Sequence, residues 1–170
     1  MPALHRAAAV LGLALFGAAA CTPATTAAAG PRPSADSIAL AARAHAFMDA
    51  YGIDLRMGER ERIAERYDPY GAWLVGEGRK RFDPADSIRA RYRGRWRPPA
   101  SFEWKDLSFE AVGPDAVVVT GLFLWGVSAE RRITCSYTAL LVRREDLDRT
   151  PLFHIRLEDE SCAPAPPPAP

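Results

Sequence analysis

The second half of the chain alternates apolar and polar residues at the period of β-strands, and this pattern restricts the folds open to it. The predicted strands cover residues 102–111, 116–127, 132–143 and 152–160. The alternation slips near Asp106, which indicates a bulge. Residues 116–127 (AVVVTGLFLWGV) are apolar on both faces, as expected for a central strand covered on both sides. Short turns between these strands predict an antiparallel meander.

Helical patterns come before the strands. Ser34 or Asp36 can cap a first helix, and Gly58 can end it. Its apolar face is formed by Leu40, Ala44, Phe47, Tyr51 and Leu55. A short second helix is predicted at residues 59–66, with Ile63 and Ala64 facing inward.

A third helix is predicted after Asp83, which would cap it, and Pro84, which suits the first helical position. Ile88 and Tyr92 would face inward from it. The strand 72–75 and the glycine-containing turn after it place a short hairpin between the second and third helices. Helices first and a meander afterwards predict an α+β domain over residues 36–162, with the helices on one face of a curved sheet.

Both ends of the chain differ from this domain. Residues 1–20 have a weakly basic start and an apolar core too short to span a bilayer, which predicts a signal sequence. Ala18 to Ala20 followed by Cys21 resembles a bacterial lipobox, so we expect lipidation of Cys21 and an outer-membrane anchor; cleavage without lipidation is the alternative. Residues 22–35 predict a flexible tether, and residues 163–170 an extended Pro/Ala tail.

The charge balance argues against a general polyanion binder. Of the 22 basic residues Arg6 lies in the signal, which leaves 21 against 21 acidic residues. Arginines interleaved with Tyr92 and Trp96 can bind nucleic acid, but the expected export speaks against that partner. We favour the interpretation that these arginines pair with Asp83, Asp86 and Glu103.

Three stretches together resemble the NTF2-like (SnoaL-like, cystatin-like) superfamily. They are residues 46–51 (AFMDAY), residues 67–75 (YDPYGAWLV) with Ile88 and Tyr92 after them, and residues 153–161 (FHIRLEDES). The resemblance spans residues 36–162. It implies a cone in which three N-terminal helices pack on a strongly curved, mostly antiparallel sheet around a pocket, and a homodimer formed through the sheet. Members include isomerases, dehydratases and cyclases as well as binding and scaffold domains, so the fold does not settle the function.

Cys135 and Cys162 are predicted to form a disulfide. If they face each other in the last hairpin, residue 141 opposes 156 and residue 143 opposes 154, which leaves a loop of sensible length. Directly opposed residues lie within disulfide range, and an exported location favours the bond. Two free thiols are the alternative.

The acidic run 158–160 supplies the catalytic candidates, Glu158 and Asp159. Alternation places Glu158 and Glu160 on one face and Asp159 on the other. A carboxyl group in an apolar pocket would have a raised pKa and could transfer protons. We favour a solvated strand end that pairs with Arg156 or Arg143.

The remaining candidates are weaker. Asp49 and Asp54 lie on the first helix, where Asp49 is expected to be exposed. The aromatic pocket candidates are Tyr51, Trp73, Tyr92, Trp104, Trp125 and Tyr137. His45 and His154 have no ligand spacing, so neither a metal nor another cofactor is expected.

Three functions stay open at this point. The favoured one is an envelope-anchored domain that binds a small apolar molecule or an envelope protein. The others are an isomerase-, dehydratase- or cyclase-type enzyme that uses a pocket carboxylate, and a dimeric scaffold. An acid inside the cavity would favour the enzyme, and a cavity filled by its own aromatic side chains would favour the scaffold.

Overall fold

A computed structural model describes residues 33–76, 78–145 and 151–162. The predicted signal sequence, Cys21, residues 22–32 of the tether and the Pro/Ala tail lie outside these ranges. None of the helices within them is both long and apolar enough to cross a membrane.

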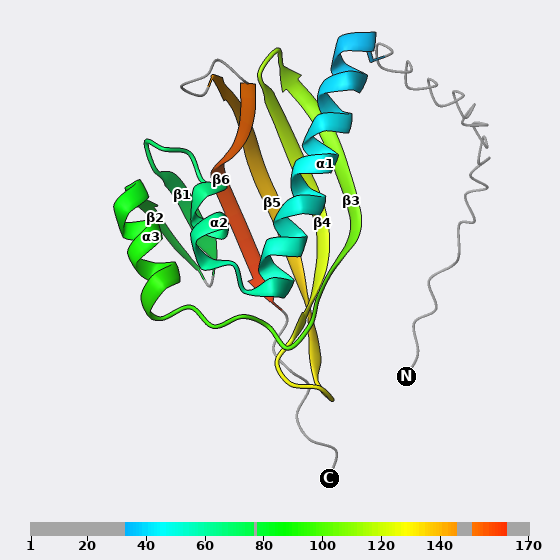
Figure 1. Ribbon diagram of the computed structural model, residues 1–170. Coiled ribbons are helices and arrows are strands. Elements are labelled where there is room, and N and C mark those ends of the chain that lie inside the picture. The colour runs from blue at the N-terminus through cyan, green and yellow to red at the C-terminus, as the bar shows by residue number, and fades with distance from the viewer. Residues whose placement is uncertain (1–32, 77, 146–150, 163–170) are drawn as a thin grey trace, which may run out of the picture. The chain divides into compact units, whose positions relative to one another are not determined.

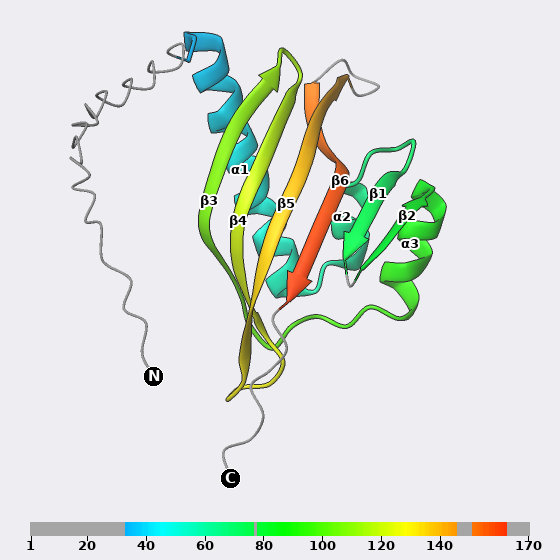
Figure 2. The same cartoon turned by 180° about the vertical axis from the view of Figure 1, so that it is seen from behind.

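The described residues form three helices and one six-stranded sheet in the order β2-β1-β6-β5-β4-β3. The elements are α1 (Ala35–Met57), α2 (Arg60–Glu65), β1 (Ala72–Gly76), β2 (Arg79–Asp83), α3 (Ala85–Gly94), β3 (Phe102–Gly113), β4 (Ala116–Gly126), β5 (Arg132–Glu145) and β6 (Pro151–Cys162). Only β1 and β6 pair in parallel within this sheet. All three helices lie on one face of the curved sheet (Figures 1 and 2), as the sequence predicts for an α+β domain.

Helix α1 has the ends that its sequence predicts. The Ser34 hydroxyl accepts a hydrogen bond from the Ser37 N–H at 3.1 Å, and Gly58 ends the helix in the left-handed conformation with φ of 70°. The face of α1 that meets the sheet carries Leu40, Ala44, Met48, Tyr51 and Leu55, all buried. At Gly52 an added Cβ would lie 2.7 Å from the Trp104 indole nitrogen, so glycine lets this ring pack on the helix.

The start of α3 differs from the prediction. Asp83 is the last residue of β2, where it pairs with Ala72, and its carboxylate accepts hydrogen bonds from Arg81 at 2.9 and 3.1 Å. The helix therefore begins at Ala85 without a side-chain cap. Ile88 and Tyr92 are buried, as predicted.

Strand β4 is covered on one face only, so the prediction of two covered faces is wrong. Val117, Val119 and Phe123 are buried beneath the helices, whereas Leu122 on the other face is 39% exposed. The bulge predicted near Asp106 is present as a register shift, and Asp106 has a positive φ of 48°.

The last hairpin contains the predicted disulfide. Cys135 and Cys162 are directly opposed, with Cα atoms 4.0 Å apart, and are covalently bonded. The prediction of a bond between these two cysteines is therefore confirmed, and the alternative of two free thiols is wrong.

The predicted register fails farther along this hairpin. Leu141 opposes Ile155, and Arg143 opposes Phe153, each one residue short of the expectation. Between Leu140 and Leu141 the register shifts because β6 contains one residue more than β5 there. An extra residue reverses which face the following side chains occupy. As a result Phe153, Ile155 and Glu158 are all buried on the helical side of the sheet.

Loss of the disulfide should destabilise the domain. The bond closes a loop with a sequence separation of 27 residues, so replacing both cysteines by alanine should lower the free energy of unfolding by about 2–4 kcal/mol. Urea denaturation with and without dithiothreitol measures this. Reductant should destabilise the natural protein and leave the double variant unchanged; a natural protein insensitive to reductant would contradict the prediction.

Candidate functional site

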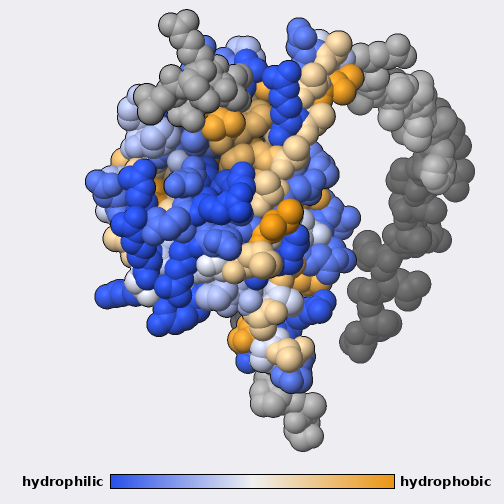
Figure 3. Space-filling model, viewed as in Figure 1, coloured by the Kyte–Doolittle hydropathy of each residue, from blue (hydrophilic) through white to orange (hydrophobic). Residues whose placement is uncertain are grey.

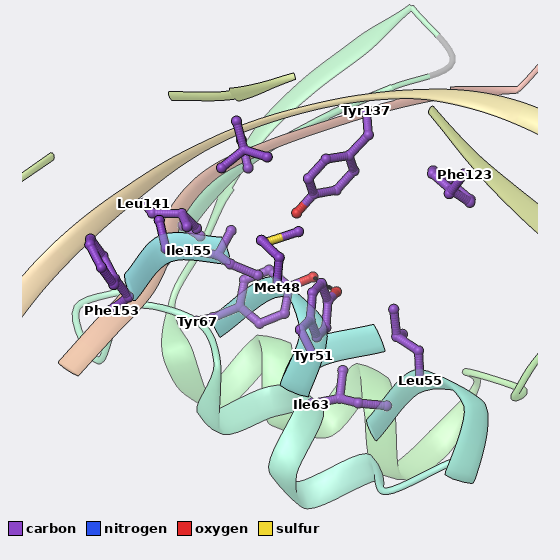
Figure 4. Packing of buried hydrophobic residues seen from close by; sticks show 14 of the residues in the cluster. Met48, Tyr51, Leu55, Ile63, Tyr67, Phe123, Tyr137, Leu141, Phe153 and Ile155 are labelled. Carbon is purple, nitrogen blue, oxygen red and sulfur yellow. Dashed lines mark hydrogen bonds between the residues drawn. The ribbon is translucent and has the colours of Figure 1, made fainter. Parts of the chain in front are cut away.

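The carboxylate of Glu158 lies at the centre of the domain, surrounded by tyrosine hydroxyls. Tyr67 donates to its Oε2 at 2.5 Å, and Tyr137 and Tyr51 donate to its Oε1 at 3.1 and 3.3 Å. The hydroxyl of Tyr92 lies 2.8 Å from that of Tyr67. We call these five residues the tyrosine–glutamate cluster. Figure 4 shows Tyr137 reaching from the sheet toward Tyr51 on α1.

Every layer of the fold contributes to this cluster. Tyr51 lies on the buried face of α1, Tyr92 on α3 and Tyr137 on β5. Tyr67 follows α2 and is held by a bridge to Ile155 of β6. Glu158 faces the same way because it opposes the buried Ala139 of β5, which lies on the same face of the sheet as Tyr137. The cluster therefore depends on the packing of the helices on the sheet.

The direction of these hydrogen bonds follows from the number of protons. Each tyrosine has one hydroxyl proton, and a carboxylate has none. Because Tyr67 donates to Glu158, it accepts from Tyr92, and Tyr92 in turn accepts from the Arg91 guanidinium at 3.2 Å. A chain of polar contacts thus runs from Arg91 to Glu158.

Burial dominates the acid–base properties of the cluster. Burial raises the pKa of Glu158. The hydrogen bond from Tyr67, the charge of Arg91 and the hydrogen bonds from Tyr137 and Tyr51 lower this pKa, but burial has the larger effect. Burial, and after it the charge of Glu158, raises the pKa of Tyr92 to about 12. The tyrosines consequently keep their protons at neutral pH and remain hydrogen-bond donors to Glu158.

An open pocket of about 840 Å³ adjoins the cluster. Tyr51 and Tyr92 form the part of its wall that belongs to the cluster. Its apolar wall consists of Leu55, Trp96, Phe123, Trp125 and Ile133. Its polar wall consists of Arg81, Asp83, Arg91, Arg95 and Glu160. The pocket thus has one apolar and one charged side. Another hollow, of about 550 Å³ at the N-terminal end of α1, lies away from the cluster.

Glu160 is the carboxylate of β6 that reaches the pocket. It lies on the same face as Glu158, two residues further along, and opposes Tyr137. By its solvent-accessible surface the residue is exposed, and it lines the pocket. The crowding of its carboxyl group by protein atoms, and after it the charge of Glu158, raises the pKa of Glu160 to about 8.

The aromatic candidates fall into two groups, those that line the pocket and those that lie in the cluster or pack against it. Tyr51, Tyr92 and Trp125 line the pocket. Tyr137 lies in the cluster, and Trp104 packs against its ring and donates to the Met48 carbonyl at 2.9 Å.

The remaining aromatic candidate, Trp73, lies on the outer face of the sheet, so its assignment to the pocket is wrong. Its neighbour Leu74 pairs with Glu158 and is buried, and alternation turns Trp73 outward against Phe82.

The acidic candidates also differ from the favoured interpretation. Glu158 is only 4% exposed, so the interpretation as a solvated strand end is wrong for this residue. Arg156 donates to the Gly71 carbonyl, and Arg143 pairs with Asp115. Neither arginine therefore forms the predicted ion pair with the carboxylates of residues 158–160. Asp159 lies half-buried on the outer face.

The other polar candidates have local partners. Asp49 is exposed, as expected, and pairs with His45 at 3.0 Å. Asp54 is buried, where Arg66 donates to it at 2.6 Å, apart from the cluster. Within the described ranges, no group of three or more His, Cys, Asp or Glu side chains is placed to hold a metal ion.

Sequence reasoning missed Tyr67 and the pocket positions of Arg91 and Glu160. A signal for Tyr67 was available, because it follows the inward-facing Ile63 and Ala64 at helical spacing. Asp86 has the arginine partner that the sequence predicts, since Arg89 pairs with it at 2.9 Å.

Comparison with solved structures identifies the architecture. A cystatin-like fold protein from Burkholderia xenovorans superposes with a TM-score of 0.60 at 18% identity, over 75% of this chain and 95% of that one. The fold is NTF2-like. An NTF2-like protein of unknown function from Pseudomonas putida has a TM-score of 0.60 at 15% identity, over 74% and 87% of the two chains. One from Shewanella oneidensis has a TM-score of 0.58 at 14% identity, over 71% and 97%.

These likenesses concern the NTF2-like fold alone. No protein-family model matches the sequence, and no curated protein matches it. The fold does not fix a function, so the chemistry of this chain must be inferred from its own pocket and cluster.

The raised pKa of Glu160 predicts a pH dependence of stability. The pKa rises from an ordinary value of 4.5 to about 8 on folding, so the folded state binds the extra proton between these values. The stability that this extra proton gives the folded state is present in full below pH 4.5 and is lost as the pH rises toward 8. Relative to Glu160→Gln, the natural protein should lose stability across this interval.

Urea denaturation at several pH values from 5 to 9 measures this difference. Asp159→Asn is the matched control, because it removes a charge from the other face of the same strand. Parallel pH profiles for the natural protein and Glu160→Gln would contradict the prediction.

Proposed function

We propose that this domain binds a small amphipathic molecule in the pocket beside the tyrosine–glutamate cluster. The observation that carries the proposal is the pocket itself, of about 840 Å³. This volume lies in the range of sites for small molecules. The domain's own aromatic side chains line the pocket instead of filling it, which speaks against a scaffold with a closed core.

The two walls indicate how a ligand would lie. Trp96 and Trp125 offer flat apolar surfaces to a ring or chain. Arg91, Tyr92 and Glu160 offer hydrogen bonds on the charged side. A ligand with one apolar end and one polar end matches both walls, whereas a wholly apolar one would leave the charged wall without partners.

The tryptophans supply the first test. The probe is N-phenyl-1-naphthylamine, an uncharged aromatic molecule whose fluorescence rises in apolar surroundings. Because its contact with the tryptophan ring is lost, Trp125→Ala should weaken binding about tenfold, a loss of about 1.4 kcal/mol. Trp73→Ala is the matched control, since Trp73 is 37% exposed on the opposite face of the sheet.

Fluorescence titration distinguishes the outcomes. Weakening by Trp125→Ala alone supports binding in the pocket. Equal weakening by both variants, or no binding by the natural protein, would overturn the proposal.

A second candidate function is proton-transfer catalysis in the same pocket, and Glu160 is the observation that favours it. A general acid or base is most effective when its pKa lies near the working pH, and the pKa of Glu160 is raised to about 8. Its carboxyl group borders the space that a ligand would occupy. The buried Glu158 is satisfied by three hydroxyl groups, so Glu160 replaces it as the catalytic candidate.

Proton exchange tests this second function without knowledge of the substrate. The probe is 2-acetylnaphthalene, whose methyl protons exchange with D₂O when a base removes them. Proton magnetic resonance should show exchange at least about 100-fold faster with the natural protein than with Glu160→Gln. Equal rates would exclude this role for Glu160 and leave the binding proposal standing.

A further inference from the structure

A smaller hollow opens beside the pocket and shares part of its charged wall. It measures about 270 Å³ and has Arg81, Arg91, Glu160 and Cys162 in common with the pocket. Arg79 is an additional cation in its lining. Three guanidinium groups, Arg79, Arg81 and Arg91, therefore border one small space. We call them the arginine subsite.

The sheet explains why these arginines meet. Arg79 and Arg81 are two residues apart on β2 and pair with Gly76 and the inward-facing Leu74, so both point to the helical side. Lys80, between them, points to the outer face and lies over the Trp73 ring. Arg91 comes from α3, on the same side as the helices.

A close strand contact brings Glu160 to the same place. Gly76 pairs with Glu160, and a Cβ at Gly76 would lie 2.6 Å from the Glu160 carbonyl oxygen. Glycine therefore allows β1 and β6 to approach at the position where the hollow opens.

The donors of the subsite exceed its acceptors. Arg81 is paired with Asp83. Arg91 donates to Tyr92 from Nη2, while its buried Nε has no hydrogen-bond partner. Among the described residues, the Arg79 side chain has no hydrogen bond or ion pair, and Glu160 forms no ion pair with any of the three arginines. Figure 3 shows hydrophilic side chains gathered over α2 and α3, on this side of the molecule.

We propose that this hollow is an anion subsite and that the ligand is an amphipathic anion. A carboxylate, phosphate or sulfonate group binds Arg79 and Arg91, and the apolar body lies against Trp96 and Trp125. Guanidinium groups match such oxyanions in charge and geometry, and an unpaired buried N–H gains most from an acceptor. The inference rests on the proposed binding function and adds the chemical class of the ligand.

Two probes with the same aromatic body test the subsite. One is 8-anilinonaphthalene-1-sulfonate, and the other is the uncharged N-phenyl-1-naphthylamine. The natural protein should bind the sulfonate about tenfold more tightly. Arg79→Gln should abolish this preference by weakening the sulfonate about tenfold, and it should change the uncharged probe less than about twofold. Adding salt should weaken the sulfonate alone.

Lys80→Gln is the matched control, because it removes a positive charge from the same strand on the opposite face. It should leave both probes unchanged, and circular dichroism should show that both variants are folded. Equal affinities for the two probes, unaffected by Arg79→Gln, would overturn the anion subsite and leave the pocket intact. If neither probe binds the natural protein, both proposals are overturned.

Discussion

The buried carboxylate of Glu158 is the constraint on which the rest of the structure depends. A polar side chain at 4% exposure is tolerated only when hydrogen bonds replace its water, and here three tyrosine hydroxyls do so. Leaving such a buried group without partners costs about 1–3 kcal/mol or more. Because the donors come from α1, from the segment after α2 and from β5, the same bonds hold the helices in place on the sheet.

Two features of β6 allow this carboxylate to share one face of the sheet with apolar core residues. The extra residue in β6 puts Phe153 and Ile155 in the core together with Glu158 and Glu160, which strict alternation would forbid. The disulfide then fixes Cys162 opposite Cys135, two residues beyond Glu160. Because of the bulge, the first half of β6 can place apolar side chains in the core while its second half places acidic side chains on the same face.

The sequence predicts the parts of the fold that depend on local patterns. The caps of α1, the slip at Asp106 and the cysteine pair all follow from residue types and spacing. The bulge in β6 could not be predicted in this way, because the amino-acid sequence of residues 151–162 contains no pattern that indicates an extra residue. The burial of Glu158 was missed for a related reason: its acceptors are satisfied by tyrosines up to 107 residues away in the chain. Charge runs are usually solvated, and only the tertiary contacts reverse that expectation.

The orientation of the tyrosine protons also limits what the pocket can recognise. Tyr51 donates its proton to Glu158, and Tyr92 donates its proton to Tyr67. Neither tyrosine therefore has a proton to offer a developing oxyanion in the pocket that both line. Negative charge on a ligand must instead be met by the arginines. Arg91 already lies beside the cluster, where it donates to Tyr92 at 3.2 Å, so the positive wall of the pocket begins at the cluster itself.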